Sequence, residues 1–225
     1  MNVKLFKNKF NKCIKFDHKL SKFTWFGVGG NAEILFMPEN EKSLVFFLRN
    51  KPQEYNVLAI GAGSNLIIRD KGVNGIVLVT KKLKNISIDK NGVISAQAGA
   101  TDAEVARFAR DCERTGLEFL LGIPGTIGGG IKMNSGAFGS EFKDILIDVT
   151  AINLSGEFRV FSVKELGMQY RKIGISNEWI FCTARFKSSK DSKENIDNKM
   201  KQILRLRKTA QPTGVKTCLL YTSPS

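Results

Sequence analysis

The sequence is short of the side chains from which most metal and nucleophile sites are built. Its 225 residues include a single histidine, His18, and only four cysteines: Cys13, Cys112, Cys182 and Cys218. The cysteines lie far apart, with no Cys-x-x-Cys motif and no spacing typical of metal ligands. A disulfide framework and a zinc site are therefore disfavoured, and the cysteine usage is typical of a protein in a reducing cytoplasm.

Long apolar runs are missing as well. No stretch reaches the roughly 20 apolar residues that a membrane-spanning helix needs. The basic N-terminal segment MNVKLFKNKFNKCIKF lacks an apolar core and a small-residue cleavage site, so no signal peptide is predicted. With 42% hydrophobic and 25% charged residues, the composition indicates a soluble globular protein of one or two domains.

Acidic residues are few compared with basic ones. The chain has 21 Asp and Glu against 35 Lys and Arg, which gives a formal net charge of +14. A lysine-rich solvated surface is the first interpretation, and attraction of small anions such as nucleotides is the second. Nucleic-acid binding ranks third, because the lysines are spread along the chain and no basic-aromatic pattern of an RNA-binding module is present.

Apolar periodicity and turn signals predict an α+β chain, with an early βαβ-like part and a later, mostly antiparallel part. The capping box Thr101-x-x-Glu104 opens one helix, and Gly116 is expected to end it. The segment 187–197 is expected to be a polar linker. The predicted strands are 31–37, 57–60, 75–80, 86–88, 93–100, 145–154, 157–162 and 179–186, and the predicted helices are 39–50, 101–116 and one carrying Ile196, Met200, Ile203 and Leu204.

Glycine is abundant and concentrated in two segments, GAGSN at 61–65 and GIPGTIGGG at 122–130. Neither is a familiar phosphate loop. Leu66 stands where a Rossmann fingerprint needs its third glycine, and the run LIIRD that it opens has a strand-like rather than a helical pattern. The second segment is followed by Ile131 and Lys132, not by the Lys-Ser/Thr of a P-loop.

Both segments can nonetheless bind an anion through the backbone. Consecutive N–H groups of GAGSN, with the Ser64 hydroxyl and the Asn65 amide, suit a pyrophosphate. The second segment, poor in side chains and constrained by Pro124, would let a planar ligand lie against its backbone. One such loop is more often an ordinary turn, but two at predicted strand ends favour a binding site.

In combination, four stretches resemble the ordered signature of the UDP-N-acetylenolpyruvoylglucosamine reductases, which are flavoenzymes of peptidoglycan synthesis. The match is collinear from about Lys22 to Thr217. The stretches are TWFGVGGNAEILFMP (24–38), GAGSNLII (61–68), GIPGTIGGGIKMNSGAFG (122–139) and the pair Tyr170-Arg171.

The resemblance implies an α+β fold with a vanillyl-alcohol-oxidase (PCMH)-type FAD-binding domain at 22–187. That domain would consist of two α/β subdomains, about 22–80 and 81–187, which hold the flavin between them. Residues 1–21 would be an N-terminal extension, and residues 188–225 the incomplete start of a C-terminal substrate domain. The implied protein is a cytoplasmic oxidoreductase of cell-wall synthesis, with no nucleic-acid or membrane partner.

The resemblance also implies FAD and NADPH as cofactors and a UDP-sugar as substrate. Hydride passes from NADPH through the flavin to the enolpyruvyl double bond, and Arg171 would meet the charge that develops on the substrate carboxylate. Arg207 would lie near the substrate diphosphate or NADPH, although a solvated helix-end arginine is an equal alternative; Tyr170 is left without a role. The residues expected to hold FAD are Gly61, Ala62, Gly63, Ser64, Asn65, Gly122, Ile123, Pro124, Gly125, Gly128, Gly129, Asn134, Gly136 and Ala137.

The match breaks at the final eight residues, CLLYTSPS. Family members continue past the position of Thr217 with a Gly-Ser-x-Phe-Lys-Asn-Pro segment, whose serine protonates the enolate, and a distant glutamate assists. The printed chain has neither, so we expect a flavin binder with impaired or no turnover. Three alternatives stay open: another small-molecule flavin oxidoreductase, a nucleotide-binding module without redox chemistry, and a nucleic-acid binder.

Overall fold

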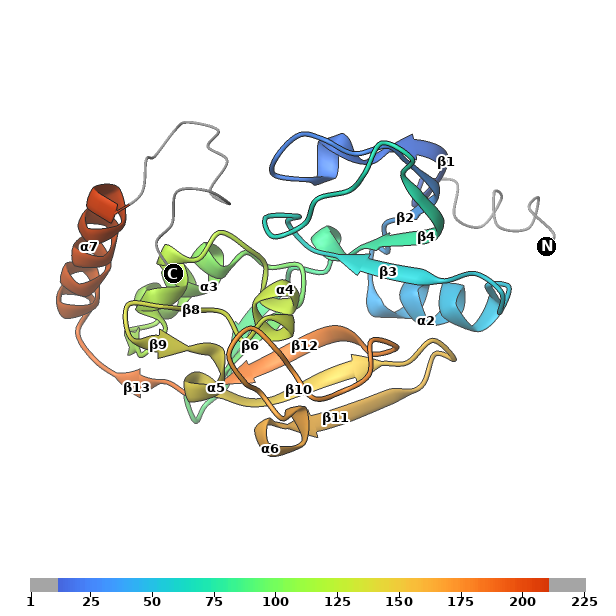
Figure 1. Ribbon diagram of the computed structural model, residues 1–225. Helices are drawn as coiled ribbons and strands as arrows, with labels where there is room; N and C mark the ends of the chain where they lie inside the picture. The colour runs from blue at the N-terminus through green and yellow to red at the C-terminus, as the bar shows by residue number, and fades with distance from the viewer. Residues whose placement is uncertain (1–11, 211–225) are drawn as a thin grey trace.

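The computed structural model describes residues 12–210; the predicted end of the family match at Thr217 and the CLLYTSPS tail lie outside this range. The described chain is built around two β-sheets (Figure 1). The first has the strand order β1-β2-β4-β3, with β1 at Ile14–Lys19, β2 at Asn31–Phe36, β3 at Val57–Ile60 and β4 at Val73–Val79. β2, β4 and β3 are parallel, which confirms the predicted βαβ-like part, and β1 pairs antiparallel with β2.

Helix α2 (Glu41–Asn50) crosses between β2 and β3 and joins the first sheet to the second. Asn40 opens it with a capping box, which satisfies N–H groups that the first turn leaves free. The Phe47 ring stacks on Phe36 of β2 with centroids 3.8 Å apart. The same apolar cluster includes Ile152 and Ile180 of the second sheet, so α2 is buried from both sides.

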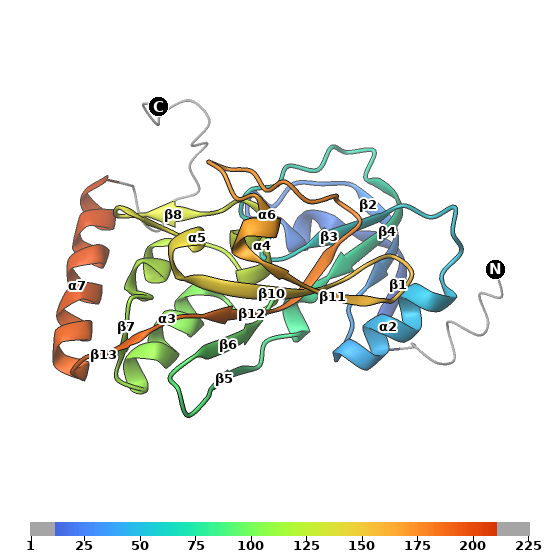
Figure 2. The ribbon, with the colours of Figure 1, turned by 90° about the horizontal axis from the view of Figure 1, so that it is seen from below.

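The second sheet is entirely antiparallel, as predicted, with the order β11-β10-β12-β6-β5. The 3₁₀-helix η3 and the helices α3 and α4 pack against it, and α7 lies at the end of the molecule away from the first sheet (Figures 1 and 2). The strands are β5 (Ile86–Ile88), β6 (Ile94–Gln97), β10 (Leu146–Ile152), β11 (Phe158–Ser162) and β12 (Ile180–Phe186). The helices are α3 (Asp102–Asp111), η3 (Glu118–Gly122), α4 (Ile127–Lys132), α5 (Phe142–Ile145), α6 (Val163–Leu166) and α7 (Lys193–Ala210).

Shorter elements fill the connections. Two-residue strands pair as β7 with β13 and as β8 with β9. Their bounds, with those of the remaining 3₁₀-helices, are β7 (Arg114–Thr115), β8 (Gly136–Ala137), β9 (Ser140–Glu141), β13 (Ser189–Lys190), η1 (Leu20–Phe23) and η2 (Thr80–Lys82).

Three predicted elements are wrong, each because tertiary contacts replace a local preference. LIIRD (66–70) is a loop: Ile68 is buried, while the carbonyl of Arg69 accepts a hydrogen bond from the Gly30 N–H at 3.1 Å instead of joining a sheet. The helix predicted for 101–116 ends at Asp111, because the chain turns there to form β7. The polar segment 187–197 is no linker, since it contains β13 and the first turn of α7.

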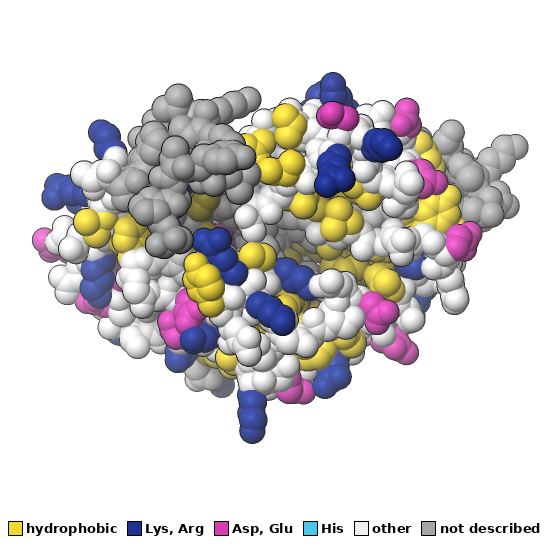
Figure 3. Space-filling view, in the orientation of Figure 1, with side chains coloured by type: hydrophobic (Ala, Val, Ile, Leu, Met, Phe, Trp, Pro, Cys, Tyr) yellow, Lys and Arg dark blue, Asp and Glu magenta, His cyan; other side chains and the backbone are white. Residues whose placement is uncertain are grey.

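The charged residues do not gather into one band on the face seen in Figure 3. Lysine and arginine side chains are spread across it and are mixed with acidic ones. Within residues 12–210, no helix is long and apolar enough to cross a membrane, and no three His, Cys, Asp or Glu side chains come together as a metal site.

Candidate functional site

The two glycine-rich segments meet between the sheets, as a joint binding site would require. The first, 61–65, follows β3, whereas the second, 122–126, runs from η3 into α4. A Cβ placed on Gly61 would lie 2.1 Å from the Thr126 hydroxyl oxygen, and one placed on Gly125 would lie 4.0 Å from the Ser64 hydroxyl oxygen. We call this region, formed by 61–65 and 122–126, the loop junction.

The first segment keeps its backbone donors available. Gly63 has a φ of +65°, and a Cβ there would lie 2.0 Å from the Phe23 carbonyl oxygen, so only glycine fits. The Gly63 carbonyl accepts a hydrogen bond from Trp25 N–H at 3.0 Å, which fixes the bend. Within the described residues, the N–H groups of 61–65 donate to no backbone carbonyl. The segment can therefore offer consecutive donors to an anion.

The helical part of the second segment does not offer the free donors that the sequence suggested. Residues 127–132 form α4 rather than an open bend, and the segment follows η3 rather than a strand. The Ile127 N–H donates to the Ala100 carbonyl at 2.9 Å, and the Gly128 N–H donates to the Ala98 carbonyl at 2.9 Å. These donors bind the segment to the second sheet and are not available to a ligand.

Several glycines of the second segment, and Gly136 after it, are required by the packing of the protein itself. Four are pressed so closely against neighbours that an added Cβ would clash: Gly122 with Phe138 at 2.4 Å, Gly128 with Ala98 at 2.9 Å, Gly130 with Phe142 at 2.4 Å and Gly136 with Ser140 at 2.8 Å. Packing within the protein is therefore enough to explain the glycine at Gly122, Gly128 and Gly136. Gly129 is exposed and its nearest neighbour is the Thr126 hydroxyl, 3.7 Å from a Cβ placed there.

The other predicted FAD contacts differ in their accessibility. Ala62 and Asn65 are exposed on the first loop, and Pro124 is exposed on the second. Ile123 is half-buried against the apolar core of the second sheet, and Ala137 is half-buried in β8.

Two buried polar side chains that sequence reasoning missed lie at the loop junction. Asp102, the first residue of α3, is 0% exposed, and Thr126 is 3% exposed. Neither the Asp102 carboxyl oxygens nor the Thr126 hydroxyl has a hydrogen-bond partner in the described chain. Burial raises the pKa of Asp102 to about 8. In the sequence, Asp102 looks like an ordinary acidic residue in a helix's first turn, so no local signal could have found it.

Asn134 is predicted from the sequence to bind the cofactor, but its side chain is fully engaged elsewhere. It is 3% exposed, and its amide nitrogen donates to a Glu141 carboxyl oxygen at 2.7 Å and to the Gln169 carbonyl at 3.3 Å. Its side-chain oxygen accepts a hydrogen bond from the Lys143 N–H at 3.0 Å. Asn134 therefore holds the turn 169–172, and its side-chain amide is occupied by these contacts.

That turn carries Arg171. A bridge between Gln169 and Lys172 closes it, and Arg171 has a φ of +52°, a left-handed conformation that is uncommon outside glycine. The Arg171 guanidinium is exposed and lies 5.3 Å from the centre of the Tyr170 ring. Such strained positions occur most often at functional sites, and the contacts of Asn134 help to maintain this one.

Replacing Asn134 with alanine is expected to lower the free energy of unfolding by about 1–3 kcal/mol, because buried partners lose their hydrogen bonds. Hydrogen exchange at 169–172 should accelerate, because the turn loses its anchor. Asn153→Ala is the matched control: Asn153 also makes three hydrogen bonds, in the β10–β11 turn. Unchanged exchange at 169–172 in Asn134→Ala, measured by mass spectrometry, would contradict the positioning role.

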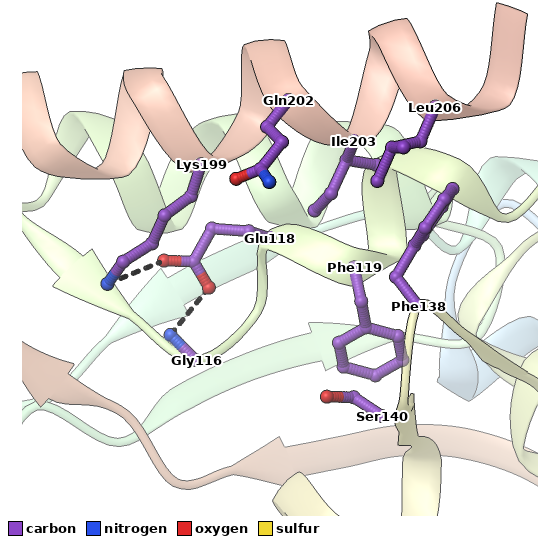
Figure 4. Close-up of a pocket in the computed structure, with 9 residues that line it drawn as sticks. All are labelled: Gly116, Glu118, Phe119, Phe138, Ser140, Lys199, Gln202, Ile203 and Leu206. Atoms are coloured by element: carbon purple, nitrogen blue, oxygen red, sulfur yellow. Dashed lines mark hydrogen bonds and ion pairs between the residues drawn. The ribbon is translucent and has the colours of Figure 1, made fainter. Parts of the chain in front are cut away.

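Arg207 lies on α7, apart from the loop 61–65 (Figure 1). It stands one helical turn after Ile203, which lines a pocket of about 330 Å³ between α7 and η3 (Figure 4). In that pocket Lys199 approaches Glu118 at 3.8 Å, and Glu118 accepts a hydrogen bond from the Gly116 N–H at 2.8 Å. Arg207 is not among the pocket residues, and its Nε is buried without a partner in the described chain.

Comparison with known proteins gives consistent matches. A family model described as an FAD binding domain matches residues 32–162. The chain is 39% identical to a UDP-N-acetylenolpyruvoylglucosamine reductase of Rickettsia bellii, covering 96% of this chain and 71% of the relative, and 38% identical to one of Pelagibacter ubique, covering 96% and 72%. The crystal structure of the Thermus caldophilus reductase matches with a TM-score of 0.75 and 32% identity, over 89% of this chain and 70% of that one.

A glucooligosaccharide oxidase of Acremonium strictum shares the fold, with a TM-score of 0.56 at 18% identity. Fold and loop junction together define a flavin-dependent oxidoreductase with a vanillyl-alcohol-oxidase (PCMH)-type FAD-binding domain of two α/β parts. The chain belongs to the UDP-N-acetylenolpyruvoylglucosamine reductase family, and it spans about 70% of the length of the relatives cited above.

FAD fits the loop junction on two structural grounds. The N–H groups of 61–65 are free to bind the anionic diphosphate of a dinucleotide. The buried, unpartnered polar atoms of Asp102 and Thr126 lie beside the same loops, as expected where a polar ligand completes the hydrogen bonding.

Proposed function

We propose that this protein catalyses the NADPH-dependent, FAD-mediated reduction of the enolpyruvyl group of UDP-N-acetylglucosamine enolpyruvate to UDP-N-acetylmuramate, in peptidoglycan synthesis in the cytoplasm. The observation that supports this best is the match of 96% of the chain to relatives that carry the reductase name. The loop junction adds a physical basis, because it brings together the two segments expected to hold the flavin.

In this proposal the residues Gly61, Ala62, Gly63, Ser64 and Asn65 bind the FAD diphosphate through backbone N–H groups and the two polar side chains. The residues proposed to lie beside the ring system are Gly122, Ile123, Pro124, Gly125, Gly128, Gly129, Gly136 and Ala137. When bound, FAD would serve as the two-electron carrier between NADPH and the enolpyruvyl double bond.

Arg171 is proposed to orient the substrate and to stabilise the reaction's negative charge. Its positively charged guanidinium presents a planar pair of donors that matches a carboxylate. As hydride adds to the terminal carbon, charge spreads from the neighbouring carbon into the substrate carboxylate, where a fixed cation lowers the barrier. Arg207 is proposed to contact the UDP-sugar diphosphate or NADPH from α7.

We propose that the FAD-binding domain consists of two subdomains, one for each sheet, and that the substrate domain begins after residue 187. The first subdomain then starts at β1, earlier than the sequence suggested, because β1 pairs with β2 along five residue pairs.

Purified protein tests the function directly. We expect bound or readily added FAD, seen by visible absorbance, and NADPH oxidation that depends on the enolpyruvyl substrate. A colourless protein that takes up no FAD would refute flavin binding. NADPH oxidation indifferent to the enolpyruvyl substrate would favour another flavin oxidoreductase.

A further inference from the structure

Asp102 occupies the loop junction from the side of the second sheet. Its Oδ2 lies 2.8 Å from the position that a Cβ on Gly125 would take, and the Ser64 hydroxyl oxygen lies 4.0 Å from the same point. The Asp102 N–H donates to the Gly125 carbonyl at 3.3 Å, which holds the start of α3 against the second loop. The carboxyl thus lies against the second segment at Gly125, near a point that Ser64 of the first segment also approaches.

No charged side chain compensates this carboxyl. The two segments of the loop junction, 61–65 and 122–126, contain no titratable residue. η3, which packs against α3, carries Glu118, whose carboxylate is bound by the Thr115 hydroxyl at 2.5 Å and the Gly116 N–H at 2.8 Å. On its own helix, the Glu104 carboxylate is bound to the Thr101 N–H at 2.8 Å and the Thr101 hydroxyl at 2.7 Å. Charges that face α3 from α7, such as Asp197, pair with Arg110 at the other end of the helix.

A fully buried carboxyl with neither a hydrogen-bond partner nor a counter-ion is rare, because native chains satisfy almost all such groups. The neighbouring Thr126 hydroxyl is in the same state. Two unpartnered buried groups at one place indicate that a ligand supplies the missing partners.

We propose that Asp102 is part of the FAD site, where its protonated carboxyl donates a hydrogen bond to an oxygen of the bound dinucleotide, and that ionisation of Asp102 weakens FAD binding. The proposal rests on FAD binding alone and not on the reduction of a UDP-sugar. If it fails, the proposed function is unaffected.

The direction of the pH dependence follows from proton linkage. Burial raises the pKa of Asp102 from its ordinary value of 3.8 to about 8 in the folded chain, so the carboxyl is mainly protonated at pH 7. Above that value a carboxylate forms beside a diphosphate that already carries negative charge, and the two repel each other in a poorly solvated site. FAD binding above this pH therefore requires Asp102 to take up a proton. Because protons become scarcer as the pH rises, the affinity for FAD falls.

The experiment measures the dissociation constant of FAD, by flavin fluorescence, on the full 225-residue chain from pH 6 to pH 9. We expect it to be constant near neutral pH and to rise about tenfold between pH 7 and pH 9, as for a group that must be protonated with a pKa of about 8. Asp102→Asn keeps a donor and cannot ionise, so it should match the parent at pH 7 and bind about tenfold more tightly at pH 9. Asp102→Leu keeps the shape without the donor and should bind several-fold more weakly at every pH.

Asp111→Asn is the matched control. Asp111 ends the same helix, is exposed, and pairs with Arg110 at 3.0 Å and Lys193 at 3.1 Å, so its replacement should leave the pH profile of the parent unchanged. A parent affinity that does not change up to pH 9, a measurement that needs no variant, would overturn the proposal. An Asp102→Asn variant whose FAD affinity falls with rising pH as the parent's does would also overturn it. Equal FAD affinities of Asp102→Leu and Asp102→Asn would overturn the proposed hydrogen bond.

The folded chain without FAD gives a second readout. Because folding raises this pKa, the folded state binds more protons than the unfolded state between pH 3.8 and about 8, and the free energy of unfolding falls as pH rises through that range. Asp102→Asn should remove this part of the pH dependence of the free energy of unfolding, which urea unfolding at several pH values measures. An unchanged pH dependence would show that the carboxyl is not protonated on folding.

Discussion

Gly63→Ala is expected to weaken FAD binding by at least about 100-fold, an effect of roughly 3 kcal/mol. Two costs act at this position. The left-handed backbone, with φ at +65°, disfavours any side chain by about 1–2 kcal/mol. In addition, the new Cβ would lie 2.0 Å from the Phe23 carbonyl oxygen, which is backbone and cannot move aside alone. The loop 61–65 must therefore shift, and its N–H groups move away from the positions proposed to bind the diphosphate.

The control for this prediction is Gly139→Ala. Gly139 also has a positive φ, +81°, but a Cβ there would meet no atom within 4 Å. The variant carries the backbone penalty without the clash and should bind FAD like the parent. Titration of FAD fluorescence measures both variants, and urea unfolding shows that each is folded. Equal FAD affinity in folded Gly63→Ala and Gly139→Ala would place the dinucleotide away from the first loop.

Arg171→Ala is expected to slow hydride transfer to the enolpyruvyl substrate by about 10²–10³-fold, the usual cost of losing one preorganised group that stabilises a developing anion. The reduction of FAD by NADPH should be unchanged, because no substrate carboxylate takes part in that half-reaction. The two half-reactions are followed separately by flavin absorbance, with protein in excess over substrate so that a slow step is still observed.

Arg171→Lys and Lys172→Ala complete this experiment. Lysine keeps the charge but not the planar pair of donors, so it should restore only part of the rate. Lys172 is the neighbouring exposed cation on the same turn, and removing it should have little effect. If Arg171→Ala and Lys172→Ala slow the same step equally, general attraction by positive charge explains the data, and Arg171 has no specific role.

The elements that the sequence predicted correctly are those with local signals. The strands β10 and β11, the capping box of α3, and the βαβ-like arrangement of β2, α2 and β3 all follow from apolar periodicity and from residues close together in the chain. The family was also identified from the order of its motifs, without any knowledge of their contacts.

The roles of single residues in the candidate site could not be predicted in the same way. Asn134 follows the glycine-rich segment and looked like a ligand contact, yet its partner Gln169 is distant in the sequence. The absence of a side chain at Gly128 and Gly130 suggested space for a ligand, but that space is filled by Ala98 and Phe142. In each case the deciding neighbour comes from another part of the chain, which motif spacing does not contain.

The sequence by itself determined the family, the α+β class and the two segments that converge, because these depend on patterns of residue type and on their order. Tertiary structure alone decided which backbone donors stay free, which glycines serve packing, and that Asp102 is buried without a counter-charge. The physical reason is that hydrogen bonding and desolvation depend on the whole environment of an atom, and most of that environment is supplied by residues far away in the sequence.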